Sequence, residues 1–224
     1  MINQYIKNSN SVNHYKNFED KVIDIDWKTI NYNRIAFINK AVNQFTSCKY
    51  LEIGCETNTC FNAITTKNKI GIDPEQGGTI KTTSDEFFQN NKNFYDVIFI
   101  DGLHRYEQCR KDIMNSLNFL NDDGYIFVHD LVPRSWIEAN VPRLQTMWTG
   151  DTWKVSFELL KTDGIDFNVI LADHGIGMIK KKKKKIIYHD DFINLNELKF
   201  SDFLNKINEI NFLHAEDALQ LISK

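Results

Sequence analysis

The segment Tyr50-Leu-Glu-Ile-Gly-Cys-Glu-Thr-Asn-Thr-Cys60 decides the fold class of this chain, and two further segments repeat its pattern. Gly71-Ile-Asp-Pro-Glu75 and Phe99-Ile-Asp-Gly-Leu-His-Arg-Tyr-Glu107 are also short apolar runs that end in turns carrying acidic residues. In an open α/β sheet, the carboxyl ends of the parallel strands line the crevice where a ligand binds. Acidic residues that recur at strand ends therefore indicate one binding site built from several loops.

Composition and charge limit the classes of protein that this chain can be. Its 224 residues are 42% apolar, which is enough to bury a substantial core. The 27 Lys and Arg residues against 30 Asp and Glu give a net charge of -3, which argues against nucleic acid or an anionic membrane as a partner. We expect a small-molecule ligand instead.

The sequence contains no sign of export or membrane insertion. Its N-terminus lacks an apolar core of signal-peptide length, and no apolar run approaches the roughly 20 residues that span a bilayer. The four cysteines include no C-x-x-C pair, which fits a reducing compartment better than a disulfide framework. We therefore expect a cytoplasmic protein without a membrane span.

The spacing of apolar residues predicts alternating helices and strands around the quoted segments. Helices are expected within residues 30–47, 60–66, 84–90 and 106–120, and strands at 50–53, 70–72, 79–82, 97–100 and 125–129. Thr83 and Glu86 form a possible capping box at the start of the third helix. Residues 167–171 and 176–179 are expected to pair as an antiparallel hairpin that closes the sheet.

We expect one domain of residues 1–224 in three parts. Residues 1–27 form an N-terminal extension without clear periodicity, which could pack against another subunit of a homo-oligomer. Residues 28–189 form a Rossmann-like α/β core, and residues 190–224 form a C-terminal helical segment. The long connection at residues 131–153 is the candidate for a substrate lid.

The first two strand ends favour a nucleoside-containing ligand. Glu52 and Gly54 precede a helix N-terminus, whose backbone N–H groups can hold the charged part of such a ligand. Asp73, about 20 residues later, can accept both hydroxyls of a ribose. The G-x-G-x-x-G pattern of nicotinamide enzymes is absent, because Gly54 is followed by Glu56 and Asn58. A cofactor with an amino acid tail tolerates Glu56 better than a pyrophosphate does, since its ammonium pairs with acids.

An ordered series of motifs resembles a known family. These motifs are Leu-Glu-Ile-Gly (51–54), Gly-Ile-Asp-Pro (71–74), Thr-Ser-Asp-Glu-Phe-Phe (83–88), the segment from Asp96 to Gln108, and Gly-Tyr-Ile-Phe-Val-His-Asp (124–130). Together they resemble class I S-adenosylmethionine-dependent methyltransferases, in particular the small bacterial-type branch associated with O-methylation of glycans and natural products. The resemblance covers roughly residues 30–180 and includes the segment from Trp148 to Lys154.

The resemblance implies a fold, a cofactor and a set of site residues. The fold is a three-layer αβα sandwich with a mostly parallel sheet of seven strands, in the order 3-2-1-4-5-7-6, whose last strand is antiparallel. The cofactor is S-adenosylmethionine, transferring its methyl group to a sugar, glycan or small-metabolite hydroxyl. Its contacts, from methionine to ribose to adenine, are implied to be Glu52 and Gly54, then Asp73, then Ser84 and Asp85, with Asp101 near the ammonium or the acceptor.

Methyl transfer to oxygen requires that the acceptor hydroxyl lose a proton, so a base or a metal near the transfer point helps. His104 and His129 are the available imidazoles near the strand ends. We favour His104 as the base, with Asp101 and His129 beside it, although His104 could instead only order its loop. Asp101 and Asp130 end adjacent strands and could share Mg²⁺, but Asp130 could equally cap the following turn.

Two alternatives stay open at this level. The six lysines at 180–185 could contact phosphate, but solvated charge runs are more common. The unusual Glu56 turn also leaves room for a second function, a methyltransferase-fold binding or scaffolding module without turnover.

Overall fold

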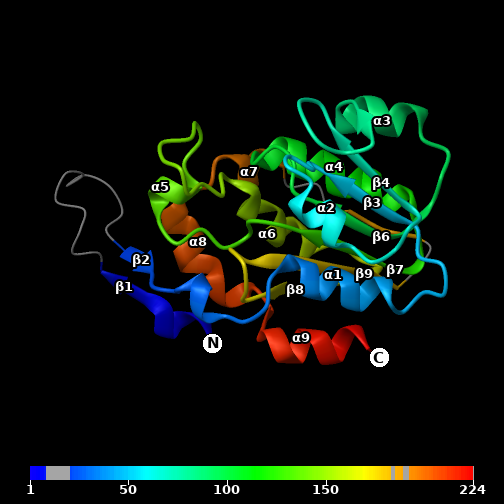
Figure 1. Cartoon of the computed structure of the whole chain (residues 1–224). Coiled ribbons are helices and arrows are strands. Elements are labelled where there is room, and N and C mark those ends of the chain that lie inside the picture. Colours follow the sequence, from blue (N-terminus) through cyan, green and yellow to red (C-terminus); the bar gives the residue numbers. More distant parts are fainter. Residues whose placement is uncertain (9–20, 183–184, 189–191, 224) are drawn as a thin grey trace.

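A sheet of eight strands forms the centre of the protein in the computed structural model (Figure 1). The structure describes residues 1–8, 21–182, 185–188 and 192–223. The strand order across the sheet is β10-β8-β9-β7-β6-β3-β4-β5. The strands are β3 (Tyr50–Ile53), β4 (Lys69–Asp73), β5 (Ile80–Lys81), β6 (Tyr95–Ile100), β7 (Leu120–Val128), β8 (Ile165–Ile170), β9 (Ile176–Lys181) and β10 (Phe212–Leu213). Only β9 runs antiparallel to its neighbours among these strands.

The predicted Rossmann-like α/β fold is confirmed, with one strand more than expected. The seven predicted strands lie in the predicted order, and the 167–171 and 176–179 hairpin is β8 paired with β9. The count of seven was wrong because β10 extends the sheet from within the segment predicted to be entirely helical. This strand has two residues and pairs in parallel with Val169 and Ile170 of β8. Two residues are too few to show a period of two in a sequence.

Helices cover both faces of the sheet (Figure 1). On one face, α1 (Arg34–Val42), α2 (Thr59–Ala63) and α9 (Ala215–Ile222) bury apolar side chains against one core cluster. On the other face, α3 (Ser84–Asn90), α4 (Tyr106–Asn118), α6 (Val155–Leu159) and α8 (Phe200–Lys206) contribute to a second cluster. Successive residues of β3 alternate between them, since Tyr50 joins the first cluster and Leu51 the second.

Shorter elements complete the described chain. They are η1 (Ile2–Tyr5), β1 (Ile6–Asn8), β2 (Lys21–Ile23), η2 (Trp27–Thr29), α5 (Trp136–Ala139), η3 (Thr152–Lys154), α7 (Phe192–Asn196) and η4 (Ile207–Glu209). Strands β1 and β2 pair antiparallel, and Ile2 and Ile23 are buried in the core cluster that contains α4. The N-terminal extension therefore contributes to the core, a role that its irregular sequence did not indicate. Within the described ranges, bilayer-spanning helices are absent.

The lysine run begins in β9, and two of its described lysines contact other residues of this chain. Lys181 Nζ donates to Leu120 O at 2.9 Å, and Lys182 pairs with Asp166 at 2.6 Å. Residues 183 and 184 of the run lie outside the described residues. These contacts favour the interpretation of the run as a strand end with surface lysines rather than as a phosphate site.

Candidate active site

The ends of β3, β4 and β6 meet at Gly54. The Gly54 N–H donates to Ile72 O at 2.9 Å, and the Asp101 N–H donates to Ile53 O at 2.8 Å. Gly54 has a φ of 85°, and a Cβ at this position would lie 2.2 Å from Asp101 O. Only glycine fits such a close approach. The turn after β3 therefore packs closely against the loop after β6. Asp101, the first of the candidate catalytic residues in the chain, lies at the start of that loop.

Asp73, the predicted ribose ligand, is held in place by backbone donors. Its Oδ1 accepts from Glu75 N at 2.8 Å and Gln76 N at 2.9 Å, and its Oδ2 accepts from Glu56 N at 2.9 Å. Burial by itself would raise the pKa of Asp73, but these bonds outweigh it and lower the pKa. The backbone thus fixes the orientation of the Asp73 carboxylate.

At two positions of the turn after β3, residues other than glycine adopt the left-handed backbone conformation that glycine favours. Glu56 has a φ of 44° and Asn58 a φ of 63°, both in the left-handed region. The Asn58 side chain stabilises this conformation, because its Oδ1 accepts from Gly78 N at 2.7 Å. The turn therefore adopts the left-handed conformations that glycine favours, with Glu56 and Asn58 in place of glycine.

Glu52 lies inside the protein rather than on the surface of the site. Its side chain is 1% exposed and accepts a hydrogen bond from the Tyr50 hydroxyl. Burial raises the pKa of Glu52 to about 7, although hydrogen bonds from Tyr50 and Cys60 act in the opposite direction. A direct contact of Glu52 with the methionine part of a cofactor stays a prediction.

Ser84 and Asp85, the predicted adenine contacts, occupy the first turn of α3. The predicted capping box is present, with Thr83 as the N-cap and Glu86 as its partner. Ser84 Oγ and Asp85 Oδ1 both accept from Gln108 Nε2, at 3.2 and 3.1 Å, which connects α3 to α4. Their contact with adenine stays a prediction.

The four candidates for catalysis and metal binding converge at the carboxyl ends of β6 and β7. His104 Nδ1 lies 3.2 Å from Asp130 Oδ2, and His104 Nε2 lies 3.6 Å from Asp101 Oδ1. His129 Nδ1 lies 3.3 Å from Asp101 Oδ1 and 3.2 Å from Asp130 Oδ1. The two imidazoles are therefore bridged by the two carboxylates. His129 and Asp130 are buried, whereas His104 and Asp101 are partly exposed.

Two residues that the sequence did not reveal complete this cluster. Arg34, the first residue of α1, pairs with Asp101 at 2.5 Å and with Asp173 at 2.8 Å. Asp173 follows β8 and also accepts from the Arg34 backbone N–H at 3.0 Å. An arginine in the first turn of a helix opposes the helix dipole, and a nearby acid offsets this unfavourable interaction. That conflict was the available signal for Arg34, but it could not identify Asp173.

When both histidines are protonated, the charges of the cluster balance. The negative charges are those of Asp101, Asp130 and Asp173, and the positive charges are those of Arg34, His104 and His129. Burial by itself would lower the pKa of each histidine, but the neighbouring carboxylates of Asp101 and Asp130 outweigh it and raise both pKa values. Burial would likewise raise the pKa of Asp101, yet the charge of His129, the hydrogen bond from His104 and Arg34 hold it well below its usual range. Protonated His104 must therefore lose its proton before it can act as a base.

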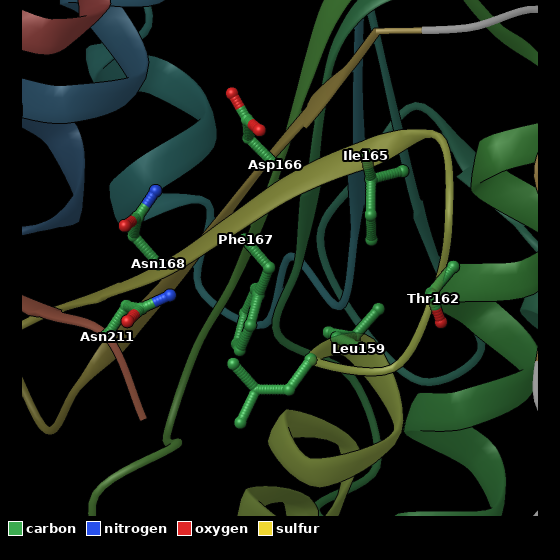
Figure 2. Close-up of a pocket in the computed structure, with 8 residues that line it drawn as sticks. Leu159, Thr162, Ile165, Asp166, Phe167, Asn168 and Asn211 are labelled. Atoms are coloured by element: carbon green, nitrogen blue, oxygen red, sulfur yellow. The ribbon is translucent and has the colours of Figure 1, made fainter. Parts of the chain in front are cut away.

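Neither of two cavities in the described part of the chain is lined by a residue of this cluster. One of about 350 Å³ is lined by Ile165, Asp166, Phe167 and Asn168 at the beginning of β8, together with Asn211 and the end of α6 (Figure 2). Asp173 follows the other end of β8, so this cavity opens at the opposite edge of the sheet. The other, of about 210 Å³, lies between the N-terminal segment and the start of α9. Neither cavity contains a residue predicted for the site.

Comparison with known proteins places the fold among methyltransferases. Residues 37–131 match the family model described as a methyltransferase domain. The chain is similar to the cofactor-bound protein Rv0187 from MTB at 12% identity and a TM-score of 0.52, over 70% of this chain and 87% of that chain. It is also similar to a putative caffeoyl-CoA O-methyltransferase from Staphylococcus aureus at 16% identity and a TM-score of 0.50, over 71% and 86%. No curated protein matches the sequence.

Proposed function

We propose that this chain, whose residues 37–131 match the model of a methyltransferase domain, transfers a methyl group from S-adenosylmethionine to a hydroxyl oxygen. The acceptor is a sugar, a glycan or another small metabolite. The observation that carries the proposal is the convergence of Asp101, His104 and Asp130 beside the Gly54 turn. Charged groups that can take a proton thus lie next to the place where this fold binds its ligand.

The residues around Gly54 fit the cofactor. Asp73 offers the ribose a carboxylate whose orientation is fixed by backbone donors, and the turn at Glu56 and Asn58 has the left-handed backbone conformation that glycine favours. Ser84 and Asp85 present oxygens at the start of α3, where the adenine would lie. When bound, the cofactor supplies an electrophilic methyl group on a sulfonium centre, and the protein supplies orientation and proton transfer.

His104 is the proposed base, and Asp101 and Asp130 set its proton affinity. The imidazole is 25% exposed, so an acceptor hydroxyl can approach it, whereas His129 is buried. His129 instead balances the charge of the carboxylates of Asp101 and Asp130. Neutral His104 would take the proton of the hydroxyl as the oxygen attacks the methyl group in line.

A divalent cation fits the same cluster. One ligand atom from each of Asp101, His104 and Asp130 lies within 4.8 Å of the others, and carboxylate oxygens are the ligands that Mg²⁺ prefers. Asp101 and Asp130 would hold the ion, which would lower the pKa of the acceptor hydroxyl. Binding of a cation would also release the proton of His104, because it competes for the same carboxylates.

We also propose a cytoplasmic location. All four cysteines are free in the structure, and Cys48, Cys55 and Cys109 are buried. Unpaired thiols are typical of a reducing compartment.

Calorimetry and a transfer assay test the proposed function. The protein is titrated with S-adenosylhomocysteine, and then incubated with methyl-labelled S-adenosylmethionine and a panel of monosaccharides, nucleotide sugars and phenols, each with Mg²⁺ or EDTA. We expect cofactor binding and transfer of label to at least one hydroxyl. Absence of cofactor binding contradicts the proposal. Binding without transfer to any acceptor favours the binding or scaffolding module instead, and equal transfer in EDTA argues against the metal.

A further inference from the structure

Residues 148–152, which we call the strap, lie against the loop that carries His104. The Trp148 carbonyl lies 3.0 Å from His104 Nδ1, and the indole of Trp148 stacks on the imidazole with ring centroids 5.2 Å apart and planes 20° apart. Gly150 has a φ of 64°, and a Cβ there would lie 1.8 Å from His104 O. The strap therefore contacts His104 through a ring, a carbonyl and a backbone surface that admits no side chain.

The strap also fixes the elements on both sides of His104. The Tyr106 N–H, at the start of α4, donates to Asp151 Oδ1 at 2.7 Å, and the N-cap residue Arg105 makes no side-chain capping bond. Asp151 thus caps this helix from 45 residues further along the chain. The Thr152 hydroxyl donates to Asp130 O at 2.7 Å. One short segment consequently joins the loop after β6 to the loop after β7.

The strap is held in place by hydrogen bonds to α5 and by an ion pair with Lys154 of η3. The N–H groups of Thr149 and Gly150 donate to Glu138 O at 3.1 and 3.0 Å. Lys154 Nζ, on a side chain that is only 6% exposed, pairs with Asp151 Oδ2 at 2.9 Å. Because these partners lie outside the two catalytic loops, the strap can transmit a fixed position to them.

We infer that the strap is a positioning device for methyl transfer, with Trp148, Asp151 and Thr152 as positioning residues that set the place of His104 relative to Asp130. This inference rests on the proposed function of the site. Misplacement of a reacting group by about 1 Å can cost on the order of 100-fold in rate. Trp148 differs here from Trp153, whose ring is buried in the core among phenylalanines.

Nuclear magnetic resonance of the His104 ring tests the inference without any acceptor. In the wild-type protein, the stacked indole of Trp148 displaces the ring-proton resonances of His104 upfield. The variants Thr152→Val and Asp151→Ala alter neither ring, yet both should lose a large part of this displacement because they release the strap. Asp151→Asn should retain it, since an amide oxygen can still accept from Tyr106 N. Thr152→Val keeps the test decisive if Asp151→Ala does not fold.

Thr162→Val is the matched control, because Thr162 is also buried and its hydroxyl donates to a backbone carbonyl, Glu158 O, at 2.9 Å. This variant should keep the wild-type His104 resonances. With an acceptor from the panel above, Thr152→Val should lower kcat by about 10- to 100-fold and leave the KM for S-adenosylmethionine unchanged.

Two outcomes would overturn the inference. His104 resonances in Thr152→Val and Asp151→Ala that coincide with those of Thr162→Val would show that the strap does not position the ring. A rise in the KM for S-adenosylmethionine with kcat unchanged would place the strap in cofactor binding instead. A wild-type protein that transfers no methyl group contradicts the proposed function alone, because the ring resonances still decide whether the strap positions His104.

Discussion

The two halves of the candidate site hold their acidic groups in different ways. On the β3–β4 side, Asp73 accepts three backbone N–H bonds, none from more than 17 residues away. On the β6–β7 side, Asp101 and Asp173 pair with the side chain of Arg34, from 67 and 139 residues away. Two histidines, at 104 and 129, complete that half.

This difference suggests a division of labour. Backbone donors cannot titrate, so the three hydrogen bonds to Asp73 do not depend on the protonation of a donor side chain. The donors of the other half are side chains, and the carboxylates of Asp101 and Asp130 raise the pKa values of both histidines there. A rigid half suits the recognition of a ribose, and a titratable half suits proton transfer.

His104→Gln should produce the largest effect, since it removes the proposed base from the titratable half. We expect the rate of methyl transfer to fall by about 10²- to 10⁴-fold, while the affinity for S-adenosylhomocysteine stays the same. Transfer of labelled methyl groups and calorimetry measure the two quantities. His214→Gln, at an exposed histidine ahead of α9, is the control and should keep full activity. Unchanged transfer in His104→Gln would leave the titratable half without a catalytic role.

Glu52→Gln tests whether the Glu52 carboxyl, on the β3 side, titrates near neutral pH. Such a titration makes the stability of the protein depend on pH. Burial raises the pKa of Glu52 from 4.5 to about 7, so the fold favours the protonated carboxyl. Its stabilising contribution is complete below about pH 4.5 and is lost as the pH rises through about 7. Glutamine imitates the neutral form, so above pH 8 the variant should be more stable by up to about 3 kcal/mol.

Urea unfolding at pH 4.5 and pH 8 measures this difference, with Glu75→Gln, an exposed glutamate of the β4 loop, as the control. A difference of the same size at both pH values would mean that Glu52 does not titrate near neutrality. That outcome would sharpen the contrast between the two halves.

Asp73→Asn tests the recognition role of the rigid half. The amide keeps one oxygen acceptor but loses the charge, so we expect S-adenosylhomocysteine to bind about 10- to 100-fold more weakly. Calorimetry measures the dissociation constant, and Asp122→Asn, at an aspartate whose side chain is 61% exposed, serves as the control. Wild-type affinity in Asp73→Asn would exclude Asp73 as the ribose ligand and would break the proposed division.

Arg34→Gln should give the smallest effect, on the stability of the titratable half. It leaves Asp101 and Asp173 without their shared cation, but the three side chains are 15–27% exposed and solvent screens part of the loss. We expect the free energy of unfolding to fall by about 1–2 kcal/mol in denaturant titrations. Lys40→Gln, in the last turn of the same helix, is the control. Equal stability in both variants would mean that Arg34 contributes no net stabilisation.

Local sequence signals located the elements and the strand-end acids correctly. The apolar runs at β3, β4, β6 and β7 and the capping box of Thr83 and Glu86 depend on neighbours within a few residues. The same holds for the positions of Asp73, Asp101 and Asp130 at the ends of their strands. Strand order followed from the resemblance to class I methyltransferases. The two-residue β10 escaped detection because it forms only where β8 offers an edge.

The sequence by itself thus determined the alternation of strands and helices, and with it the edge of the sheet at which the acids gather. Only the tertiary structure decided that Arg34 and Asp173 join them and that residues 148–152 bridge the loops after β6 and β7. The reason is physical. A turn or a capping box is selected by the torsion angles and hydrogen bonds of adjacent residues, whereas an ion pair across 139 residues exists only after the sheet has brought its partners together.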